Sequence, residues 1–480
     1  MKKTKIVATL GPATDDIEIM KAIIKEGINV ARMNFSHGNH DEHKERLEKF
    51  RNACKTENVI LPVLMDTKGP EIRTGEFDGK VNLKTNSPFT IFYEERVGDE
   101  NGCSISYKEL YKDVKEGDAI LFDDGLVKAL VESIDGKDIK CRICNDGLIS
   151  TKKSVNVPGV SVNLPPLTKK DIEDLKFACE NDYDFIAMSF VRKATDVIMA
   201  REILKKNGGE DIQIIAKIEN REGVDNIDDI IAVADGIMIA RGDLGVEIPY
   251  EQVPFVQHDL IKKGYMRGKV VITATQMLDS MIRNPRPTRA EVADIATAIV
   301  EGTSAIMLSG ETAMDKYPVE SVRTMANVAA QTESTIDYKQ KLKWFKPECT
   351  PMSVTDSISF ATCSTAMNIN AKAIITVTTS GKTARMISRF KPSCPIIAVT
   401  PKQKVQRQLQ MSFGVTPVLA PQQNSTDELI RVAISSGLDT ELIEPGDMTV
   451  ITAGLPIGKS GTTNLLKVQV VGDIECHGVG

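Results

Sequence analysis

The sequence has one tryptophan and five histidines in 480 residues, and only 5% of its residues are aromatic. With so few imidazoles, none in a ligand pattern, a histidine metal site is not expected; we predict that His37, His40 and His43 lie on the surface where a loop enters a helix. Nowhere do about 18 uncharged apolar residues follow one another, so no membrane-spanning helix is expected. The N-terminus has no apolar core long enough for a signal peptide, and we expect a cytoplasmic protein.

Long runs of one charge sign are also missing. The net charge of -6 includes no basic stripe, so neither nucleic acid nor an anionic membrane is an expected partner. Phosphorylated small molecules need only local positive charge and remain possible. The nine cysteines are an odd number spread along the chain and do not form a disulfide framework. We interpret the one close pair, Cys141 and Cys144, as structural thiols that are not linked to each other, because no second Cys/His pair stands at metal spacing.

Eight short apolar runs alternate with helix-like stretches. Continuous runs such as 237–240 are typical of parallel strands buried on both faces, and the stretches between them supply the crossovers. Eight such units predict a closed (β/α)₈ barrel, the TIM barrel. The predicted strands are Lys5–Leu10, Asn29–Asn34, Pro62–Thr67, Phe185–Phe190, Ile214–Glu219, Gly236–Arg241, Lys269–Thr275 and Ala305–Gly310.

Between the third and fourth strands the pattern changes to short alternating runs. Turn dipeptides such as Asp124-Gly125, Asp135-Gly136 and Asp146-Gly147 separate them, which predicts an inserted all-β domain. The insert leaves and rejoins the barrel at the C-terminal end of a strand, where active sites of barrel enzymes lie, so we expect it to act as a lid.

A new alternation of strands and helices after residue 340 predicts a separate open-sheet α/β domain. Its strands are expected near Ala373–Thr378, Ile396–Thr400, Val415–Ala420, Met448–Gly454 and Leu466–Val471. The predicted domains are the barrel at 1–70 and 167–340, the lid at 71–166, the C-terminal domain at 341–473 and a possible extra segment opening at 474–480.

Polar residues gather where the predicted barrel strands end. Lys217 and Glu219 stand two positions apart and share a face of their strand, as do Arg32 and Asn34. Such charges in a buried barrel mouth are costly unless they pair or bind ligands. One Lys-x-Glu would favour a structural ion pair, but six strand ends with polar residues favour a ligand site. These ends are Arg32–His37, Asp66–Lys68, Lys217–Glu219, Arg241–Asp243, Thr275–Gln276 and Ser309–Thr312.

Two acids at this mouth have the chemistry of a metal site. Glu219 and Asp243 are hard oxygen ligands on neighbouring strands, an arrangement that suits Mg²⁺ or Mn²⁺ held by two carboxylates and substrate oxygens.

Two segments resemble phosphate-binding loops. Gly454–Ser460 has one residue too few between its glycines for a Walker A loop, so we do not interpret it as an ATPase motif. A second segment follows a strand and opens a helix, offering backbone N–H groups, hydroxyls and a lysine to an anion. A plain strand–helix turn explains it equally well, and both interpretations stay open. Its residues are Thr378, Thr379, Ser380, Gly381, Lys382 and Thr383.

One resemblance extends in order over nearly the whole chain. It is carried by Val30–His37, Met65–Arg73, Ile215–Asn220, Ala240–Gly245 and Thr273–Leu278. These segments closely resemble the signature segments of pyruvate kinases. The resemblance implies an enzyme of glycolysis that transfers the phosphoryl group of phosphoenolpyruvate to ADP, giving pyruvate and ATP.

The resemblance also implies roles for single residues. Glu219 and Asp243 would hold the divalent metal, and Lys217 would stabilise the charge on the transferring phosphoryl group. Gly242 would approach the substrate carboxylate through its backbone, and Thr275 would lie near the enol carbon that gains a proton.

The nucleotide and a monovalent ion have their own implied ligands. Arg32 and Arg73 would bind phosphates of the two substrates, and Asn34, His37 and Lys153 would complete the nucleotide site with Arg73. The oxygen donors that match the family's K⁺ ligands are Asn34, Ser36, Asp66 and Thr67. Glu71 stands where K⁺-dependent members carry an acid.

Regulation and assembly are implied in the same way. Thr378–Thr383 matches the family's effector phosphate loop and Gly458–Asn464 its neighbour, so a sugar-phosphate or nucleotide effector and a homotetramer are expected. The tail Val471–Gly480 resembles the opening of an extra C-terminal domain in some bacterial members.

Two other classes compete with this interpretation. A lyase or aldolase of the phosphoenolpyruvate/pyruvate type also uses paired acids and Mg²⁺, but needs neither such a lid nor a K⁺ ligand set. A catalytically inactive metabolite sensor would be expected to lose the metal acids or the lysine, and this chain has Lys217, Glu219 and Asp243.

Overall fold

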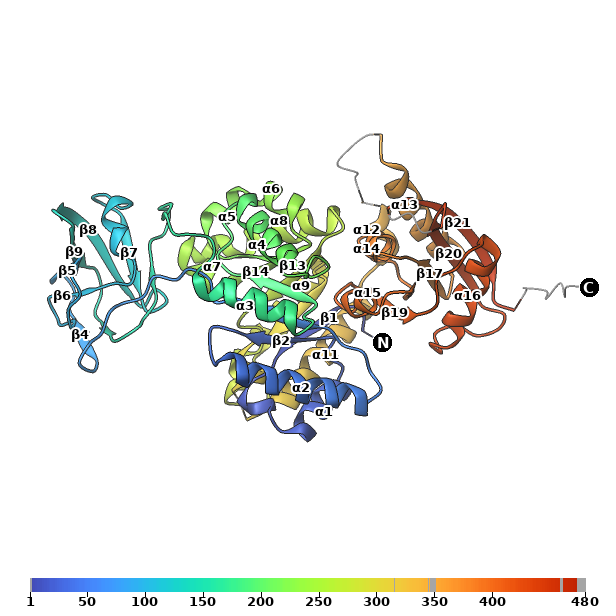
Figure 1. The fold of residues 1–480 in the computed structure, drawn as a ribbon, viewed down its shortest axis with the longest axis horizontal. Helices are drawn as coiled ribbons and strands as arrows, with labels where there is room; N and C mark the ends of the chain where they lie inside the picture. Colours follow the sequence, from blue (N-terminus) through green and yellow to red (C-terminus); the bar gives the residue numbers. More distant parts are fainter. Residues whose placement is uncertain (1, 315, 344, 346–350, 458–460, 473–480) are drawn as a thin grey trace, which may run out of the picture.

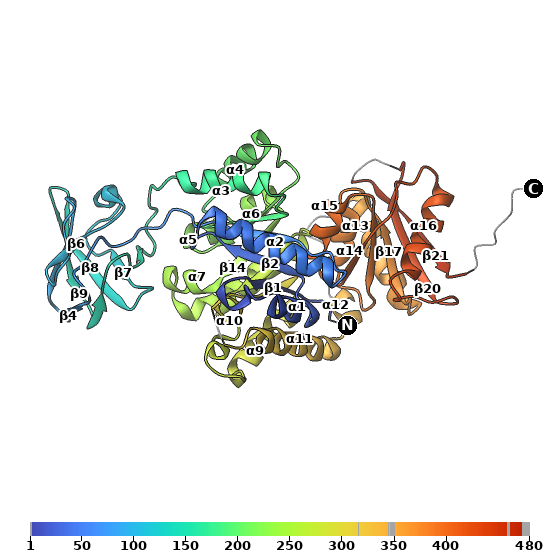
Figure 2. The ribbon, with the colours of Figure 1, turned by 60° about the horizontal axis from the view of Figure 1, so that its bottom comes forward.

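The computed structural model describes residues 2–314, 316–343, 345, 351–457 and 461–472. Three bodies lie in a row, with the barrel in the middle, a small β domain at one end and an α/β domain at the other (Figure 1). The turned view in Figure 2 shows the same order. The boundaries assigned to the domains from the sequence stay a prediction.

The central body is a closed barrel of eight parallel strands, as predicted. Around the barrel the order is β1-β16-β15-β14-β13-β12-β3-β2. The strands are β1 (Lys5–Thr9), β2 (Val30–Asn34), β3 (Val63–Asp66), β12 (Phe185–Met188), β13 (Gln213–Ile218), β14 (Gly236–Ala240), β15 (Val270–Ala274) and β16 (Ala305–Leu308). Almost every residue in them is buried, because helices cover the outside and side chains fill the inside.

Helices follow the strands around the barrel. Two begin with the predicted capping boxes: Thr168 caps α3 by bonding Asp171, and Thr288 caps α9 by bonding Glu291. The helices are α1 (Ile17–Lys25), α2 (His40–Thr56), α3 (Lys169–Glu180), α4 (Ala194–Lys206), α5 (Arg221–Asp225), α6 (Ile227–Val233), α7 (Arg241–Glu247), α8 (Val253–Met266), α9 (Arg289–Glu301), α10 (Gly310–Ala313) and α11 (Pro318–Thr335).

One strand boundary differs from the prediction. Strand β14 ends at Ala240, and Arg241, predicted as its last residue, begins the short helix α7. Asp243 therefore lies in the first turn of a helix at the barrel mouth.

The β domain is built from eight short strands between β3 and β12. Six form one sheet in the order β11-β7-β8-β9-β5-β6, and β10 pairs with β4. Alternate residues of β8 are buried, as a sheet with one solvated face requires. The strands are β4 (Val81–Leu83), β5 (Pro88–Phe92), β6 (Gly102–Ser104), β7 (Ala119–Phe122), β8 (Val127–Asp135), β9 (Asp138–Ile143), β10 (Gly147–Ile149) and β11 (Val155–Asn156).

The C-terminal domain is an open sheet in the order β19-β18-β17-β20-β21, with only β21 antiparallel. Separate apolar clusters cover its two faces. The elements are α12 (Tyr338–Lys343), α13 (Val354–Asn368), β17 (Ala373–Val377), α14 (Lys382–Ser388), β18 (Ile396–Thr400), α15 (Gln403–Leu409), β19 (Val415–Leu419), α16 (Thr426–Leu438), β20 (Met448–Gly454) and β21 (Thr463–Val470).

The surface placement of His43 was wrong. His43 is only 3% exposed, its ring stacks on Phe35 at 3.9 Å between centroids, and its Nε2 donates to the His37 carbonyl. On α2 it shares the buried face with Leu47 and Phe50 at helical spacing. The charge-rich stretch around it concealed this pattern.

Two other expectations concern the described residues. Cys141 and Cys144 are free thiols, as predicted. No helix in the described part of the chain combines the length and apolar character that a membrane crossing needs. The predicted extra segment at 474–480 lies outside the described residues.

Candidate active site

A chain of ion pairs crosses the barrel mouth. Lys217 Nζ lies 2.9 Å from Asp66 Oδ1 and 3.0 Å from Glu219 Oε1. The second oxygen of Asp66 accepts from Arg32 Nε at 2.7 Å. Asp66 and Glu219 are each 1% exposed. The structure thus brings together, from β2, β3 and β13, residues that the sequence had placed on separate strand ends.

Three further residues hold this network, and the sequence reasoning missed them. Ser189 Oγ lies 2.8 Å from Lys217 Nζ and donates to the Thr67 carbonyl at 2.6 Å. Thr9 Oγ1 accepts from Arg32. The Phe190 N–H donates to Glu219 Oε2 at 2.6 Å. Ser189 and Phe190 could have been found from their position at the end of the fourth predicted strand. They were missed because neither residue is charged.

Burial and the neighbouring charges shift the pKa values of this network in opposite directions. Burial alone would lower the pKa of Lys217, but Asp66 and Glu219 raise it well above its usual range. The two carboxylates therefore favour the ammonium form of Lys217. Burial raises the pKa of Glu219; Lys217 opposes this and Asp243 adds to it.

Asp243 is the acid at the mouth without a partner of its own. Burial raises its pKa, Lys217 opposes the shift, and repulsion from Asp124, Glu71 and Asp66 adds to it. Among the described residues none donates a hydrogen bond to its carboxylate. A carboxylate repelled by other acids and open to a cavity favours binding of a cation.

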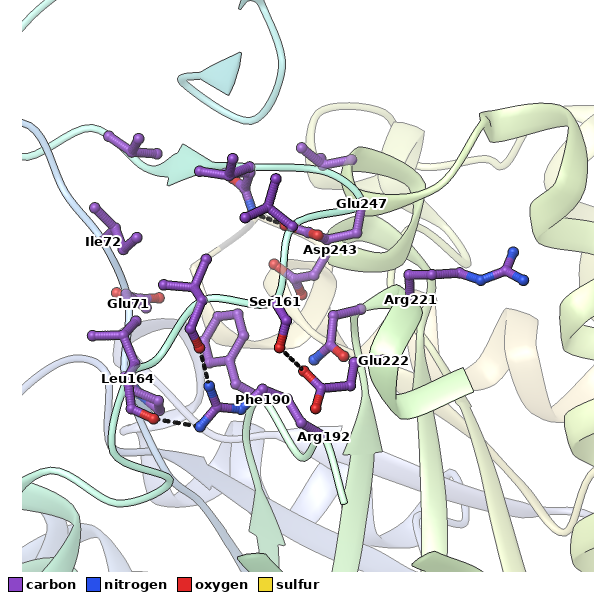
Figure 3. Close-up of a pocket in the computed structure, with 18 of the residues that line it drawn as sticks. Glu71, Ile72, Ser161, Leu164, Phe190, Arg192, Arg221, Glu222, Asp243 and Glu247 are labelled. Carbon is purple, nitrogen blue, oxygen red and sulfur yellow. Dashed lines mark hydrogen bonds between the residues drawn. The ribbon is translucent and has the colours of Figure 1, made fainter. Parts of the chain in front are cut away.

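Two cavities meet at Asp243. One, of about 600 Å³, lies between the β domain and the barrel and is lined by Arg73 from the first and Phe190 from the second. Figure 3 shows Glu71 and Ile72 on its β-domain side and Asp243 and Glu247 on its barrel side. The other, of about 590 Å³, continues past Gly242. These volumes are in the range of small-molecule sites.

Backbone strain marks the strand end that faces Gly242. Thr275 and Gln276 adopt φ values of 71° and 55°, a conformation costly for a β-branched residue such as threonine. Thr275 Oγ1 accepts from the Gly242 N–H at 2.8 Å and donates to the Ala274 carbonyl at 2.7 Å. Gly242 and Thr275, predicted to act on one substrate, are thus direct neighbours.

The β-domain cations are paired with acids of their own domain. Arg73 Nε lies 2.7 Å from Glu71 Oε2, and Lys153 Nζ lies 2.9 Å from Asp123 Oδ1. Arg73 lines the large cavity with Asp243, but Lys153 does not. Side-chain contacts to the barrel include Asn156 to Glu247 at 2.8 Å and Ser161 to Glu222 at 3.0 Å. Arg192 of the barrel also donates to the Val162 and Leu164 carbonyls (Figure 3).

The predicted K⁺ ligands lie on two adjacent strand ends. Asn34 and Asp66 are direct partners in the β2–β3 pairing, and Ser36 and Thr67 follow them. The Ser36 N–H donates to Asn34 Oδ1 at 3.1 Å. His37, predicted for the nucleotide, is exposed beside them.

The residues at the mouth fit a divalent cation completed by a ligand. Among the described residues no group of three or more His, Cys, Asp or Glu side chains is placed to hold a metal. Two acids plus substrate oxygens remain compatible with Mg²⁺, which keeps several non-protein ligands. The unpartnered Asp243 beside buried Glu219 is the observation that supports this fit.

The predicted effector loop lines a small cavity in the C-terminal domain. Thr378–Ser380 and Thr383 face the β20–β21 loop across it, and the Thr383 and Thr463 hydroxyls lie 2.8 Å apart. The adjoining segment Gly458–Ser460 lies outside the described residues.

Comparisons with known proteins cover almost the entire chain. The family model for the pyruvate kinase barrel domain matches residues 1–322, and that for the pyruvate kinase alpha/beta domain matches residues 356–469. A pyruvate kinase from Clostridium acetobutylicum is 52% identical over 473 residues, which is 98% of this chain and 100% of the relative. One from Sporosarcina psychrophila is 49% identical, over 100% of this chain and 82% of its own length.

A solved structure of a pyruvate kinase has the same fold as this chain. A pyruvate kinase from Cryptosporidium parvum superimposes with a TM-score of 0.93 at 39% identity, covering 98% of this chain and 96% of that one. Fold, site and relatives together define a phosphotransferase enzyme built on a TIM barrel. The chain belongs to the pyruvate kinase family.

Proposed function

We propose that this enzyme transfers the phosphoryl group of phosphoenolpyruvate to ADP, forming pyruvate and ATP in glycolysis, with Mg²⁺ or Mn²⁺ and K⁺ as cofactors. The observation that carries the proposal is the buried ammonium of Lys217, fixed 2.9 Å from Asp66 and 3.0 Å from Glu219 at the barrel mouth. Phosphoryl transfer needs little covalent help from the protein but depends on positioned positive charge.

Each residue at the mouth has a role in this reaction. Glu219 and Asp243 hold the divalent ion, which when bound neutralises charge on the phosphoryl oxygens. Lys217 and Arg32 stabilise the group in transfer. The backbone at Gly242 approaches the substrate carboxylate, and Thr275 lies beside the enol carbon that must gain a proton.

The nucleotide binds between the barrel and the β domain. Arg73 and Lys153 bind its phosphates with Asn34 and His37. Both cations are held by acids of the β domain in this structure, so nucleotide binding exchanges those partners for phosphate oxygens. Such an exchange is coupled to closure of the domain over the mouth, because Lys153 lies outside the large cavity.

The K⁺ site is formed by Asn34, Ser36, Asp66 and Thr67. All four supply oxygen atoms, and the direct β2–β3 pairing of Asn34 with Asp66 supports the placement. Glu71 provides a further negative charge at the rim.

We also propose allosteric control, a homotetramer and a cytoplasmic location. A sugar phosphate or nucleotide would bind at Thr378, Thr379, Ser380, Gly381, Lys382 and Thr383. Titration of such effectors against the phosphoenolpyruvate saturation curve tests the loop, and sedimentation tests the assembly.

The experiment for the activity is a lactate-dehydrogenase-coupled assay with phosphoenolpyruvate, ADP, Mg²⁺ and K⁺. Steady NADH oxidation that depends on both substrates is expected. If no pyruvate forms, the proposed reaction is wrong.

A further inference from the structure

The base of the barrel packs on the C-terminal domain, and the two halves of this contact are charged differently. Figures 1 and 2 place α14 and α15 on the side of the C-terminal domain that faces the barrel. In the α15 half, cations meet acids: Lys404 lies 2.7 Å from Asp182, and Arg407 lies 2.7 Å from both Asp182 and Asp184. This half is balanced by paired carboxylates.

The α14 half encloses a small cavity lined by cations. Lys269 comes from the barrel, and Arg385, Arg389 and Lys391 come from the C-terminal domain. No carboxylate is among the described residues that line the cavity. Asp356 forms an ion pair with Arg389 at 2.6 Å. The other three cations are Lys269, Arg385 and Lys391.

The other three cations donate to backbone carbonyls, and Lys391 Nζ also lies over the Phe413 ring, 3.9 Å from its centroid. Lys391 Nζ donates to the Thr303 carbonyl at 3.1 Å and Lys269 Nζ to the Ala234 carbonyl at 2.6 Å. Arg385 donates to the Ser380 carbonyl at 3.1 Å. Among the described residues no carboxylate forms an ion pair with any of the three. Carbonyl bonds satisfy N–H groups but leave the net charge uncompensated.

The acids whose charge acts on these cations already have other partners. Asp235, which acts on Lys269 and Arg385 at longer range, pairs with Arg201 at 2.8 Å. Glu333, which acts on Lys391, accepts the backbone N–H groups of Lys3 and Thr4.

A buried hydroxyl faces the same cavity. Ser412 lines it and is 3% exposed, and its Oγ has no hydrogen-bond partner within the described part of the chain. The other two serine hydroxyls of the lining residues are engaged: Ser388 Oγ donates to the Phe413 carbonyl, and Ser304 Oγ accepts from the Val271 N–H. Tyr265 also lines the cavity. Ser412 is therefore a free donor for whatever occupies the space.

Burial disfavours the charged form of all three cations. Burial lowers the pKa of Lys391 to about 7, with repulsion from Lys341 adding to the shift. Burial also lowers the pKa of Lys269 and of Arg385, and these two repel each other. A negative charge placed among them would oppose all three shifts.

We propose that this cavity binds a small inorganic anion that bridges the barrel and the C-terminal domain. The cavity measures about 10 Å³, the room that one water-sized atom needs. One oxygen of a phosphate group would occupy this space, and a halide would fill it with a small outward movement of the surrounding side chains. A water molecule would satisfy Ser412 but would leave the charge of the three cations unchanged.

The test is thermal unfolding of the full-length protein at constant ionic strength. Sodium gluconate, whose anion is too large for the cavity, is replaced stepwise by sodium chloride or by sodium phosphate. Either small anion is expected to raise the Tm of the wild type by roughly 1 to 3 °C. A response to chloride and phosphate, or to only one of them, identifies the source of the anion.

Two variants test whether the rise in Tm comes from anion binding in this cavity. Lys391→Met removes a cavity cation and is expected to abolish the difference between gluconate and the small anion. Ser412→Ala removes one hydroxyl donor and is expected to shift the half-maximal anion concentration upward by roughly tenfold. Lys372→Met, an exposed lysine of the same domain, is the matched control and should respond like the wild type.

The comparison of variants separates this cavity from other phosphate sites. Phosphate bound at the barrel mouth or at residues 378–383 would stabilise the wild type and Lys391→Met equally. An equal response of the two proteins, or no response of the wild type to either anion, would overturn the proposal. If Lys391→Met does not fold, an unchanged anion response of Ser412→Ala would overturn it as well.

Discussion

Replacing Lys217 by methionine removes the one ammonium that contacts two buried carboxylates at the barrel mouth. Its Nζ lies 2.9 Å from Asp66, 3.0 Å from Glu219 and 2.8 Å from Ser189. Methionine has nearly the same length and no charge, so packing changes little while the electrostatics change completely. Asp66 keeps its second partner, Arg32, but Glu219 loses its only ion pair among the described residues.

The expected loss of turnover follows from the lost charge. A single preorganised donor at a developing charge contributes about 10²–10³ in kcat, and a cation directed at a transferring phosphoryl group about 10³–10⁵. We therefore expect kcat to fall by at least about 10³, or about 4 kcal/mol in the barrier. Because Arg32 and the metal acids remain, KM for phosphoenolpyruvate should change by less than about tenfold.

The assay is coupled pyruvate formation, with phosphoenolpyruvate binding measured separately by fluorescence or calorimetry. Lys170→Met is a matched control, since Lys170 also pairs with a fully buried acid, Asp174, at 2.7 Å, but on α3 outside the mouth. It should lose some stability and retain turnover within a few-fold. Near-normal kcat in Lys217→Met, or an equal loss in both variants, would refute the role of Lys217.

Three further outcomes are expected. Glu219→Gln should raise the Mg²⁺ concentration for half-maximal activity by about tenfold or more, measured by Mg²⁺ titration; an unchanged requirement would remove Glu219 from the metal site. Replacing K⁺ by Na⁺ should reduce activity severely, and an indifferent enzyme would contradict the site at Asn34 and Asp66. Burial lowers the pKa of Lys5 from 10.5 to about 7, so the unfolded chain binds more protons between these pH values and stability should rise with pH, by up to about 1.4 kcal/mol per unit. Lys5→Met should reduce that rise, seen as a smaller gain in urea midpoint from pH 7 to pH 9; an identical gain would show that Lys5 is not the titrating group.

Much of the site could be predicted because its residues follow local rules. Lys217 and Glu219 share a strand face through the two-residue period of β structure, and their ion pair needs no knowledge of the rest of the fold. The Thr168 and Thr288 capping boxes are equally local. Where the local rule was ambiguous, prediction failed: His43 lies in a charge-rich stretch, yet its helical position turns it into the core.

The partners that cross the barrel could not be derived in this way. Lys217 and Asp66 are 151 positions apart, and Ser189 joins them from a third strand. Closure of the barrel, with its fixed stagger between strands, decides which strand ends face each other. The same closure leaves the Asp243 carboxylate without a hydrogen-bond donor among the described residues.

The sequence by itself determined the eight-strand barrel, the β insert, the C-terminal sheet and the types of residue at each strand end, because these depend on periodicity and turn chemistry within short windows. The tertiary structure alone decided how those residues share charge. It set the ammonium of Lys217 between two acids. It also gathered Lys269, Arg385 and Lys391 around one cavity that no carboxylate of the described residues lines. Electrostatic balance depends on distances through space, and these are fixed only when the barrel closes and the domains pack.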